Sequence, residues 1–425
     1  MRGFRFQHHH LLILVWGILL FAALNKNSGK KIKTVIYADV EGYYSYLPGV
    51  FIEKDLTGYP YWKGSHRGVE TKLGYKQIKY TYGVALFYLP FFLIAHLISL
   101  VGGYEANGFT DIYRYAVVFC GVFYAGLGIL LLKKTLQFYF KPGVVWLTIL
   151  CIVFGTNYYY YSIDELGMSH VYSFFLFASF VYLTSKVLET PNWKNVLLIS
   201  AVFGWIVLIR PVNGIIIFYL LLYGVFSITD LKERFTFLLT KPAKMVAAAA
   251  VMITFLSPQI LYWSYLNGEL TLWSYGDQGF TNWDNPQILN VLFNVQNGLF
   301  IYSPIVLFAV GGIFIALKKR HQYGIPALIL FCLATYIFAS WWAWWFGGAF
   351  GHRCYVEFYA LLALPLGLVV SHIVNLKNVA GKISLAVLGA ALLYYNIKLT
   401  YLYRPPWDGA DWNWDAFLKV LSKLI

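Results

Sequence analysis

Residues 38–51 read ADVEGYYSYLPGVF and follow the first long apolar run of the chain, near residues 8–24. Two carboxylates, Asp39 and Glu41, stand here among aromatic residues. Carboxylates are scarce, because the chain has 33 Lys plus Arg and only 19 Asp plus Glu. Acidic residues in a largely apolar chain often mark a functional site, although exposed carboxylates also occur in ordinary loops. The stretch is therefore a candidate site that follows a membrane anchor.

The composition indicates a membrane protein. The 425 residues are 59% hydrophobic, 20% aromatic and 12% charged, which is more apolar surface than one soluble core can bury. We expect an all-α polytopic membrane protein. The basic residues behind the net charge of +14 fall in short clusters between apolar runs, so they indicate topology and exclude nucleic acid as a partner. The four cysteines form no CxxC pair, so no disulfide or metal framework is predicted.

The first apolar run is predicted to be an uncleaved anchor with a cytoplasmic N-terminus, because Arg2 and Arg5 precede it and no small-residue cleavage site follows. Residues 25–111 then form an outer loop. Within this loop residues 82–101 are apolar, and they include Pro90. A crossing there would reverse every later loop and place most bases outside, against the positive-inside rule. We therefore predict that 82–101 is an interfacial helix.

The remaining apolar runs complete the predicted topology of about 11 transmembrane helices, with the C-terminus outside. On this topology the inner segments collect many bases and only three acids, Glu189, Asp230 and Glu233. Residues 1–398 form the transmembrane domain and 399–425 a short amphipathic tail on the outer face. The ten spans after the anchor are predicted near 112–132, 143–160, 169–187, 195–210, 213–228, 245–263, 298–317, 323–341, 354–374 and 382–398.

Polar and aromatic residues converge on the predicted outer face. Tryptophans at 341–345 and tyrosines at 158–161 are typical of a membrane-interface belt. Arg210 and Arg353 are long enough to snorkel to the same interface. Arg210 nevertheless precedes a proline where two spans meet, a costly place for a charge without an anion nearby. The further candidate site residues on this face are Tyr43, Lys79, His170, Arg210, Asp277, His352 and Arg353.

Several stretches, in this order, resemble the glycosyltransferase C superfamily (GT-C), especially its bacterial protein-mannosyltransferase-like and aminoarabinose-transferase-like branch. The resemblance covers nearly the whole chain, and the acids of its first motif are separated by Val40. Arg210 stands where many relatives have lysine. The stretches are DVEGYYSYL, KYTYGVALFYLPFFLIAH, GMSHVYSFF, LIRPVNG and FGHRCYVEFYALLALP.

The resemblance implies transfer of a sugar from a polyprenyl-phosphate donor to a lipid, glycan or protein acceptor, with inversion, at the outer face of a bacterial inner membrane. Asp39 would be the base that takes the acceptor proton, with Glu41 assisting. Arg210, Arg353 and Lys79 would bind the donor phosphate. Substrate contacts would come from Tyr43, His170, Asp277 and His352. No cofactor is required, and a divalent cation held by Asp39 and Glu41 stays open.

Two other classes of function remain. A lipid-linked sugar flippase or transporter is also polytopic and basic, but ionisable residues within the spans and internal repeats are expected of it. Most of the predicted spans lack both features. A polysaccharide polymerase or ligase also handles polyprenyl-linked sugars at the outer face, and the sequence leaves it open.

Overall fold

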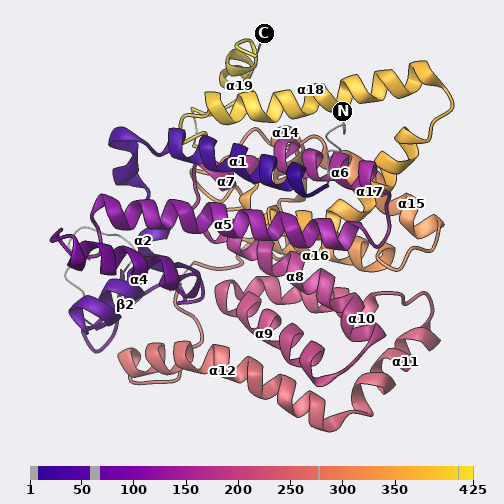
Figure 1. The fold of residues 1–425 in the computed structure, drawn as a ribbon. Coiled ribbons are helices and arrows are strands. Elements are labelled where there is room, and N and C mark those ends of the chain that lie inside the picture. The colour runs from indigo at the N-terminus through magenta and orange to yellow at the C-terminus, as the bar shows by residue number, and fades with distance from the viewer. Residues whose placement is uncertain (1–7, 58–67, 276–277, 410, 425) are drawn as a thin grey trace, which may run out of the picture.

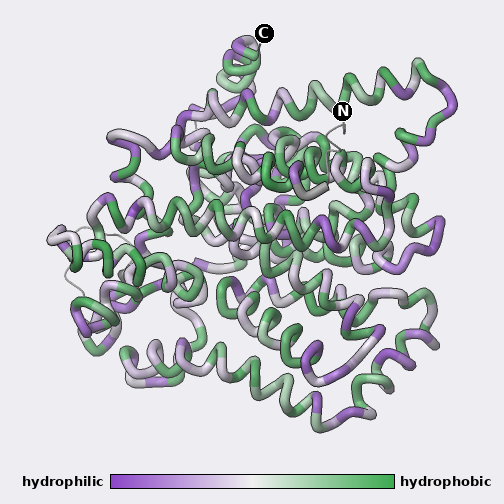
Figure 2. The backbone as a smooth tube through the Cα atoms, viewed as in Figure 1, coloured by the Kyte–Doolittle hydropathy of each residue, from purple (hydrophilic) through white to green (hydrophobic). Residues whose placement is uncertain are grey.

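The computed structural model describes residues 8–57, 68–275, 278–409 and 411–424, and these are mostly helical. The long helices lie roughly side by side across Figure 1, and hydrophobic residues dominate most of their length in Figure 2. Among the described residues four helices are long and apolar enough to cross a membrane, namely α5 (Asp111–Leu136), α8 (Ser169–Glu189), α12 (Pro242–Asn267) and α18 (Val379–Leu402). The predicted all-α polytopic class is confirmed, while the number of crossings stays a prediction.

Shorter apolar helices complete the bundle, and α5 lies near its centre. This helix packs against α8, α4 and α1, while α17 contacts both α5 and α8. On one side of the bundle α8 packs against α9, and α9 packs against α12. On the other side α17 packs against α6, and α6 packs against α18. The shorter helices are α1 (His8–Lys26), α4 (Ala85–Val101), α6 (Pro142–Gly155), α9 (Trp193–Ile209), α15 (Val306–Lys318), α16 (Gly324–Ser340) and α17 (Tyr359–Val374).

Local sequence sets where several helices begin. The side chains of Asn192 and Asn378 accept hydrogen bonds from the backbone of Asn195 and Gly381, at 2.9 and 3.1 Å, at the starts of α9 and α18. These contacts satisfy amide groups that have no partner within the helix. Proline begins α6 and α12, where its missing N–H costs no helical hydrogen bond.

Two of the predicted spans are broken, and the breaks meet. The 143–160 span divides into α6 and α7 (Tyr158–Ile163), and the 298–317 span divides into α14 (Leu299–Tyr302) and α15. At the breaks the backbone N–H of Asn157 donates to Ser303 Oγ at 3.0 Å, and Tyr359 donates to Asn157 Oδ1 at 2.7 Å. Groups released from the helical ladder therefore find partners within the protein, as broken helices in membranes require.

The predicted 213–228 span is also not one helix. It divides into the 3-10 turn Pro211–Ile216, the short helix α10 (Ile217–Leu222) and the start of α11 (Ile228–Leu239). The side chain of Ser227 caps α11 by accepting from the N–H of Asp230 at 3.1 Å. This α11 lies at the opposite end of the molecule from α2 (Asp39–Tyr44) and β2 (Lys76–Ile78) (Figure 1).

The first loop folds against the end of the bundle where α5 begins. It contains short helices and a hairpin in which Val69 pairs with Gln77. The helix α4 runs antiparallel to the first half of α5. Two contacts show this direction: Cys120 Sγ donates to the carbonyl of Phe87 at 3.3 Å, and His96 Nδ1 lies 2.6 Å from the hydroxyl of Tyr113. The other elements are the 3-10 helix Gly29–Thr34, α2 (Asp39–Tyr44), α3 (Tyr46–Pro48), the π-helical turn Gly49–Glu53, β1 (Gly68–Glu70) and β2 (Lys76–Ile78).

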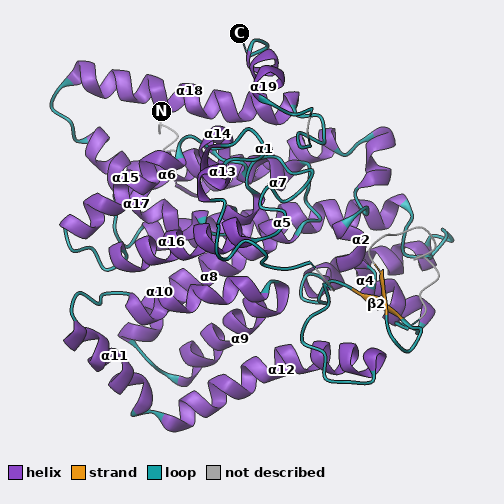
Figure 3. Ribbon diagram, turned by 180° about the vertical axis from the view of Figure 1, so that it is seen from behind, coloured by secondary structure: helices purple, strands orange, loops and turns teal. Residues whose placement is uncertain are grey.

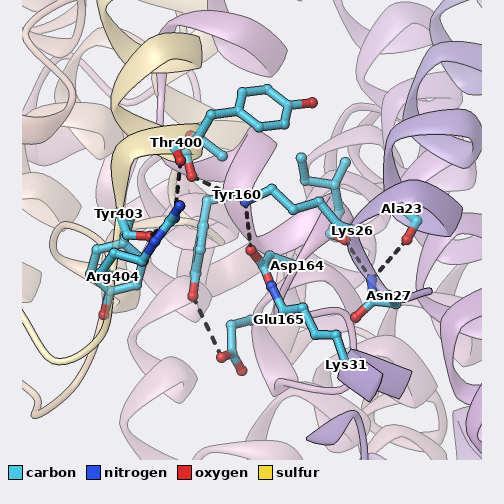
Figure 4. Close-up of polar contacts among 12 residues, drawn as sticks. Ala23, Lys26, Asn27, Lys31, Tyr160, Asp164, Glu165, Thr400, Tyr403 and Arg404 are labelled. Atoms are coloured by element: carbon cyan, nitrogen blue, oxygen red, sulfur yellow. Dashed lines mark hydrogen bonds and ion pairs between the residues drawn. The ribbon is translucent and has the colours of Figure 1, made fainter. Parts of the chain in front are cut away.

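Charged and amide side chains fasten the end of α1 to this part of the bundle. Lys26 forms an ion pair with Asp164 at 3.0 Å, and Lys31 pairs with the same carboxylate. Asn27 donates to the carbonyl of Ile163 at 2.8 Å, and Lys26 also reaches the carbonyl of Thr400 at 3.3 Å (Figure 4). The end of α1, the turn between α7 and α8, and the end of α18 are thereby held together.

The C-terminal part adds an aromatic cluster. The rings of Trp407 and Trp412 stack with centroids 4.6 Å apart, and Phe417 lies 5.8 Å from Tyr302. Seen from behind, in Figure 3, loops gather near α13, α14 and α7 and again around α4 and β2. The remaining elements are α13 (Ile288–Phe293), the 3-10 turn Arg353–Tyr355 and α19 (Trp414–Leu421).

Candidate active site

A cavity of about 460 Å³ lies where the first loop meets the bundle. Its wall comes from α2, the segment between β2 and α4, the start of α8, the end of α9, and the loop residues 272–275, 278–280 and 341–347. The aromatic part of the wall includes Trp273, Tyr275, Trp341, Trp342 and Trp345. The predicted site residues that line it are Asp39, Tyr43, Lys79, His170, Arg210 and Arg353.

Asp39 begins α2 and points into a network of polar groups. Its Oδ1 accepts a hydrogen bond from the phenol of Tyr80 at 2.7 Å, and its Oδ2 lies 3.5 Å from Arg353 Nη2. The residue before it, Ala38, has a φ of 55°, a conformation that a residue with a side chain rarely adopts. Backbone strain of this kind is commonly found at functional sites.

Tyr80 reaches Asp39 because α2 carries a glycine at the point of contact. A Cβ at Gly42 would lie 2.3 Å from the Tyr80 ring, so a larger residue there would push the ring away. Burial and the Asp39 carboxylate both raise the pKa of Tyr80, so this phenol stays protonated and donates. Burial, followed by Asp39, also raises the pKa of Tyr43 to about 12. The ring of Tyr43 lies 4.6 Å from that of Tyr80.

Arg210 caps the end of α9 with an extended backbone, as expected for a residue before proline. Its Nη1 donates to Glu357 Oε1 at 3.1 Å and its Nη2 to Cys354 Sγ at 3.2 Å. Glu357 is completely buried and also contacts His170 Nδ1 at 3.2 Å and Asn213 Nδ2 at 3.1 Å. The sequence reasoning missed Glu357, although a lone acid in the apolar stretch CYVEFYALLALP was a usable signal.

Lys79 lies beside the aromatic wall of the cavity. Its ammonium donates to Gln278 Oε1 and lies 4.4 Å from the centre of the Tyr275 ring, a cation–π geometry. Among the residues that the structure describes, three cationic side chains, Lys79, Arg210 and Arg353, line the cavity together with one carboxylate, Asp39. This surplus of positive charge favours an anionic ligand.

Two predicted residues, Glu41 and His352, are not among the described residues that line the cavity. Glu41 is two residues after Asp39 on α2, and residues at this spacing do not face each other on a helix. His352 is buried, and its ring lies 5.5 Å from Phe338 and 5.0 Å from Tyr355. Asp277 lies outside the described residues. Among the residues that are described, no group of three or more His, Cys, Asp or Glu side chains could hold a metal ion.

Solved structures with the same architecture include a bacterial and an archaeal transferase. ArnT from Cupriavidus metallidurans, determined bound to undecaprenyl phosphate, is 11% identical over 93% of this chain and 70% of its own, with a TM-score of 0.59. The Archaeoglobus fulgidus oligosaccharyltransferase in its apo form is 12% identical over 94% of this chain and 56% of its own, with a TM-score of 0.57. No protein-family model and no curated protein sequence matches the chain.

A further structure, of the oligosaccharyltransferase AglB from Archaeoglobus fulgidus in complex with an inhibitory peptide and a dolichol-phosphate, has a TM-score of 0.52 at 11% identity. It covers 94% of this chain, which spans 56% of its length. This chain therefore spans little more than half of the archaeal enzyme, and at 11% and 12% identity the likeness is one of fold. The fold that the sequence motifs implied is confirmed: the chain has the membrane-embedded helical fold of glycosyltransferase C proteins.

Proposed function

We propose that this chain is a glycosyltransferase that moves one sugar from a polyprenyl-phosphate donor to a lipid, glycan or protein acceptor. It acts at the outer face of a bacterial inner membrane. The observation that carries the proposal is the meeting of Asp39 with Arg210, Arg353 and Lys79 around one cavity. ArnT and AglB, which share the fold, were determined with undecaprenyl phosphate and with a dolichol-phosphate, and this supports a polyprenyl phosphate as the ligand here.

The proposed reaction is a single displacement at the anomeric carbon of the donor sugar. The acceptor hydroxyl gives its proton to Asp39 while its oxygen forms a bond to that carbon. The bond between the anomeric carbon and the phosphate oxygen breaks, and its electron pair leaves with the polyprenyl phosphate. Arg210 and Arg353 offset the charge that develops on the phosphate. Attack from the face opposite the phosphate inverts the configuration of the sugar.

Tyr80 and Tyr43 take supporting roles in this proposal. The phenol of Tyr80 donates to one oxygen of Asp39, which orients the carboxylate and leaves its other oxygen for the ion pair with Arg353. Tyr43, held as a neutral phenol, lines the cavity beside them. Tyr43 can donate to a sugar hydroxyl, whereas Tyr80, whose one proton goes to Asp39, can only accept from one.

A second candidate is transfer of a preassembled glycan, as by a polysaccharide ligase. The observation that favours it is the shared fold with the archaeal oligosaccharyltransferase, at a TM-score of 0.57. Both candidates use a polyprenyl-linked donor at the same cavity. They differ in the size of the glycan that moves, which a lipid analysis measures directly.

Deletion of the gene from its host, followed by mass spectrometry of lipids and envelope glycans, tests the proposal. We expect a polyprenyl-phosphate monosaccharide to accumulate and one sugar to be missing from an envelope product. Accumulation of a lipid-linked oligosaccharide would support the second candidate instead. The wild-type gene and a Glu53→Gln variant, which changes an exposed carboxylate of the same loop, should both restore the product. An unchanged lipid and glycan profile in the deletion strain would refute both candidates.

A further inference from the structure

Glu357 is a buried carboxylate among residues that line the cavity, although it is not itself part of the lining. It follows Arg353 by four residues, just before α17 begins. Burying a carboxylate is costly unless charges and hydrogen bonds compensate it closely. The contacts of Glu357 provide this compensation, and two of them are with side chains of the cavity wall.

The two oxygens of Glu357 have different partners. Oε1 accepts from Arg210 Nη1 and from Asn213 Nδ2, each at 3.1 Å. Oε2 lies 3.2 Å from His170 Nδ1. Because an ionised carboxylate only accepts, this contact places the His170 proton on Nδ1. One carboxylate thus ties together the end of α9, the turn after it and the start of α8.

Two contacts hold the Arg210 guanidinium, one with Glu357 and one with Cys354. One N–H of Nη1 points to Glu357, and one N–H of Nη2 points to Cys354 Sγ at 3.2 Å. A guanidinium has five N–H donors in a rigid plane, so fixing two leaves others for a ligand. The Arg210 side chain keeps 21% of its surface exposed and lines the cavity. The carboxylate therefore sets the orientation of a group that also faces the ligand space.

We propose that Glu357 is a positioning residue that orients Arg210, and with it His170, to receive the phosphate of a polyprenyl lipid. This inference rests on the proposed function, because the phosphate is that of the donor and of its leaving group. A purely structural role would affect folding without affecting phosphate binding. A positioning role acts through Arg210 and is lost when Arg210 is absent.

The test measures binding of undecaprenyl phosphate to the full chain in lipid nanodiscs, with undecaprenol as the uncharged comparison. Glu357→Gln keeps an oxygen for Arg210 but removes the charge that holds it. We expect its affinity for undecaprenyl phosphate to fall about tenfold, by analogy with the lower end of the loss seen when the orienting partner of a metal ligand is removed. Asp111→Asn, which breaks an ion pair of 2.7 Å with Arg114 away from the cavity, should bind like the wild type.

A double-mutant cycle separates positioning from a general structural effect. In an Arg210→Ala background, adding Glu357→Gln should change the affinity less than twofold, because the residue it positions is gone. If the two losses multiply, or if Glu357→Gln alone binds like the wild type, the positioning role is refuted. Should Glu357→Gln fail to fold, Glu357→Asp, which keeps the charge but withdraws it by one methylene, is tested in the same cycle with the same criteria.

The wild-type measurement separates failure of this inference from failure of the proposed function. If the wild type binds undecaprenyl phosphate no better than undecaprenol, the polyprenyl-phosphate ligand is wrong, and the role given to Glu357 fails with it. If the wild type prefers the phosphate and Glu357→Gln retains this preference in full, only the role of Glu357 is wrong.

Discussion

At the scale of single residues, Asp39 carries the proposed chemistry. Replacing it with asparagine keeps the shape of the side chain and removes the base, so turnover should fall roughly 10²- to 10⁴-fold. The variant should still fold, which its elution profile and thermal unfolding in detergent would show. Glu41→Gln is the matched control, because Glu41 is on the same helix and outside the cavity lining. A larger loss in Glu41→Gln than in Asp39→Asn would exchange the roles of the two acids.

Arg210 and Arg353 should be sensitive to a change that preserves charge. A guanidinium binds phosphate through a planar fork that lysine lacks. Arg353→Lys and Arg210→Lys should each lose about 1.5–3 kcal/mol of donor binding, the worth of a charge-assisted hydrogen bond, or roughly 10- to 100-fold in affinity. The measurement is the dependence of transfer on donor concentration.

If Arg210 and Arg353 only snorkel to the membrane interface, the same two lysine variants should bind the donor normally. A side chain that only extends its charged tip to the membrane interface can be replaced by lysine without loss. Unchanged donor dependence in both variants would therefore remove the arginines from phosphate binding. The Asp39 hypothesis would not be affected by that outcome.

Glu165 should make stability depend on pH. Burial, followed by the Asp164 charge, raises the pKa of Glu165 from 4.5 to about 7. Between pH 4.5 and about pH 7 the unfolded chain releases the Glu165 proton while the folded chain keeps it. The contribution of protonated Glu165 to folding stability is therefore fully present below pH 4.5 and is lost as the pH rises to about 7. Glu165→Gln should remove this decline. Thermal unfolding across that pH range, with the exposed Glu269→Gln as control, measures the difference. Parallel curves for Glu165→Gln and wild type would contradict the prediction.

At the scale of elements, the contact of α15 with α17 supports the site because Arg353 and Glu357 lie just before α17. A Cβ at Gly312 would lie 2.2 Å from the carbonyl oxygen of Pro365, so Gly312→Ala must push the helices apart. We expect a loss of about 1–3 kcal/mol, the usual cost of overpacking, and a lower midpoint of thermal unfolding. The neighbouring Gly311→Ala is the control, because its Cβ meets nothing within 4 Å. Equal midpoints for both variants would show that the contact is not tight.

The predicted topology depends on whether α4 crosses the membrane. With 17 residues α4 is as long as α9 and α16, so its length does not separate it from the predicted spans. It lies along only the first half of α5, however, and this agrees with a helix that does not cross the membrane. An impermeant thiol reagent should therefore label cysteines placed at Gly103 or Asn107 in intact spheroplasts. Labelling that appears only after lysis would reverse the topology of every later loop.

At the scale of the whole molecule, the structure differs from the sequence prediction where helices are broken. The apolar runs at 143–160 and 298–317 read as continuous spans, because hydropathy does not register where a backbone turns. At one break the backbone N–H of Asn157 donates to Ser303 Oγ at the other break, 146 residues away in sequence. This hydrogen bond exists only after the two segments have packed.

The apolar runs were enough to predict an all-helical membrane protein, and the few charged residues pointed to Asp39, Arg210 and Arg353, which line one cavity, but not to Glu357. The length of each apolar run and the charges beside it indicate which segments are buried in lipid. Charged residues are rare in such a chain, so they are easily noticed. The contacts between these groups could be seen only in the folded chain. Glu357 contacts Arg210 across 147 positions, and Tyr80 contacts Asp39 across 41, where Gly42 leaves room for its ring. Such contacts depend on helix packing and on the shape of neighbouring side chains, which no local pattern encodes.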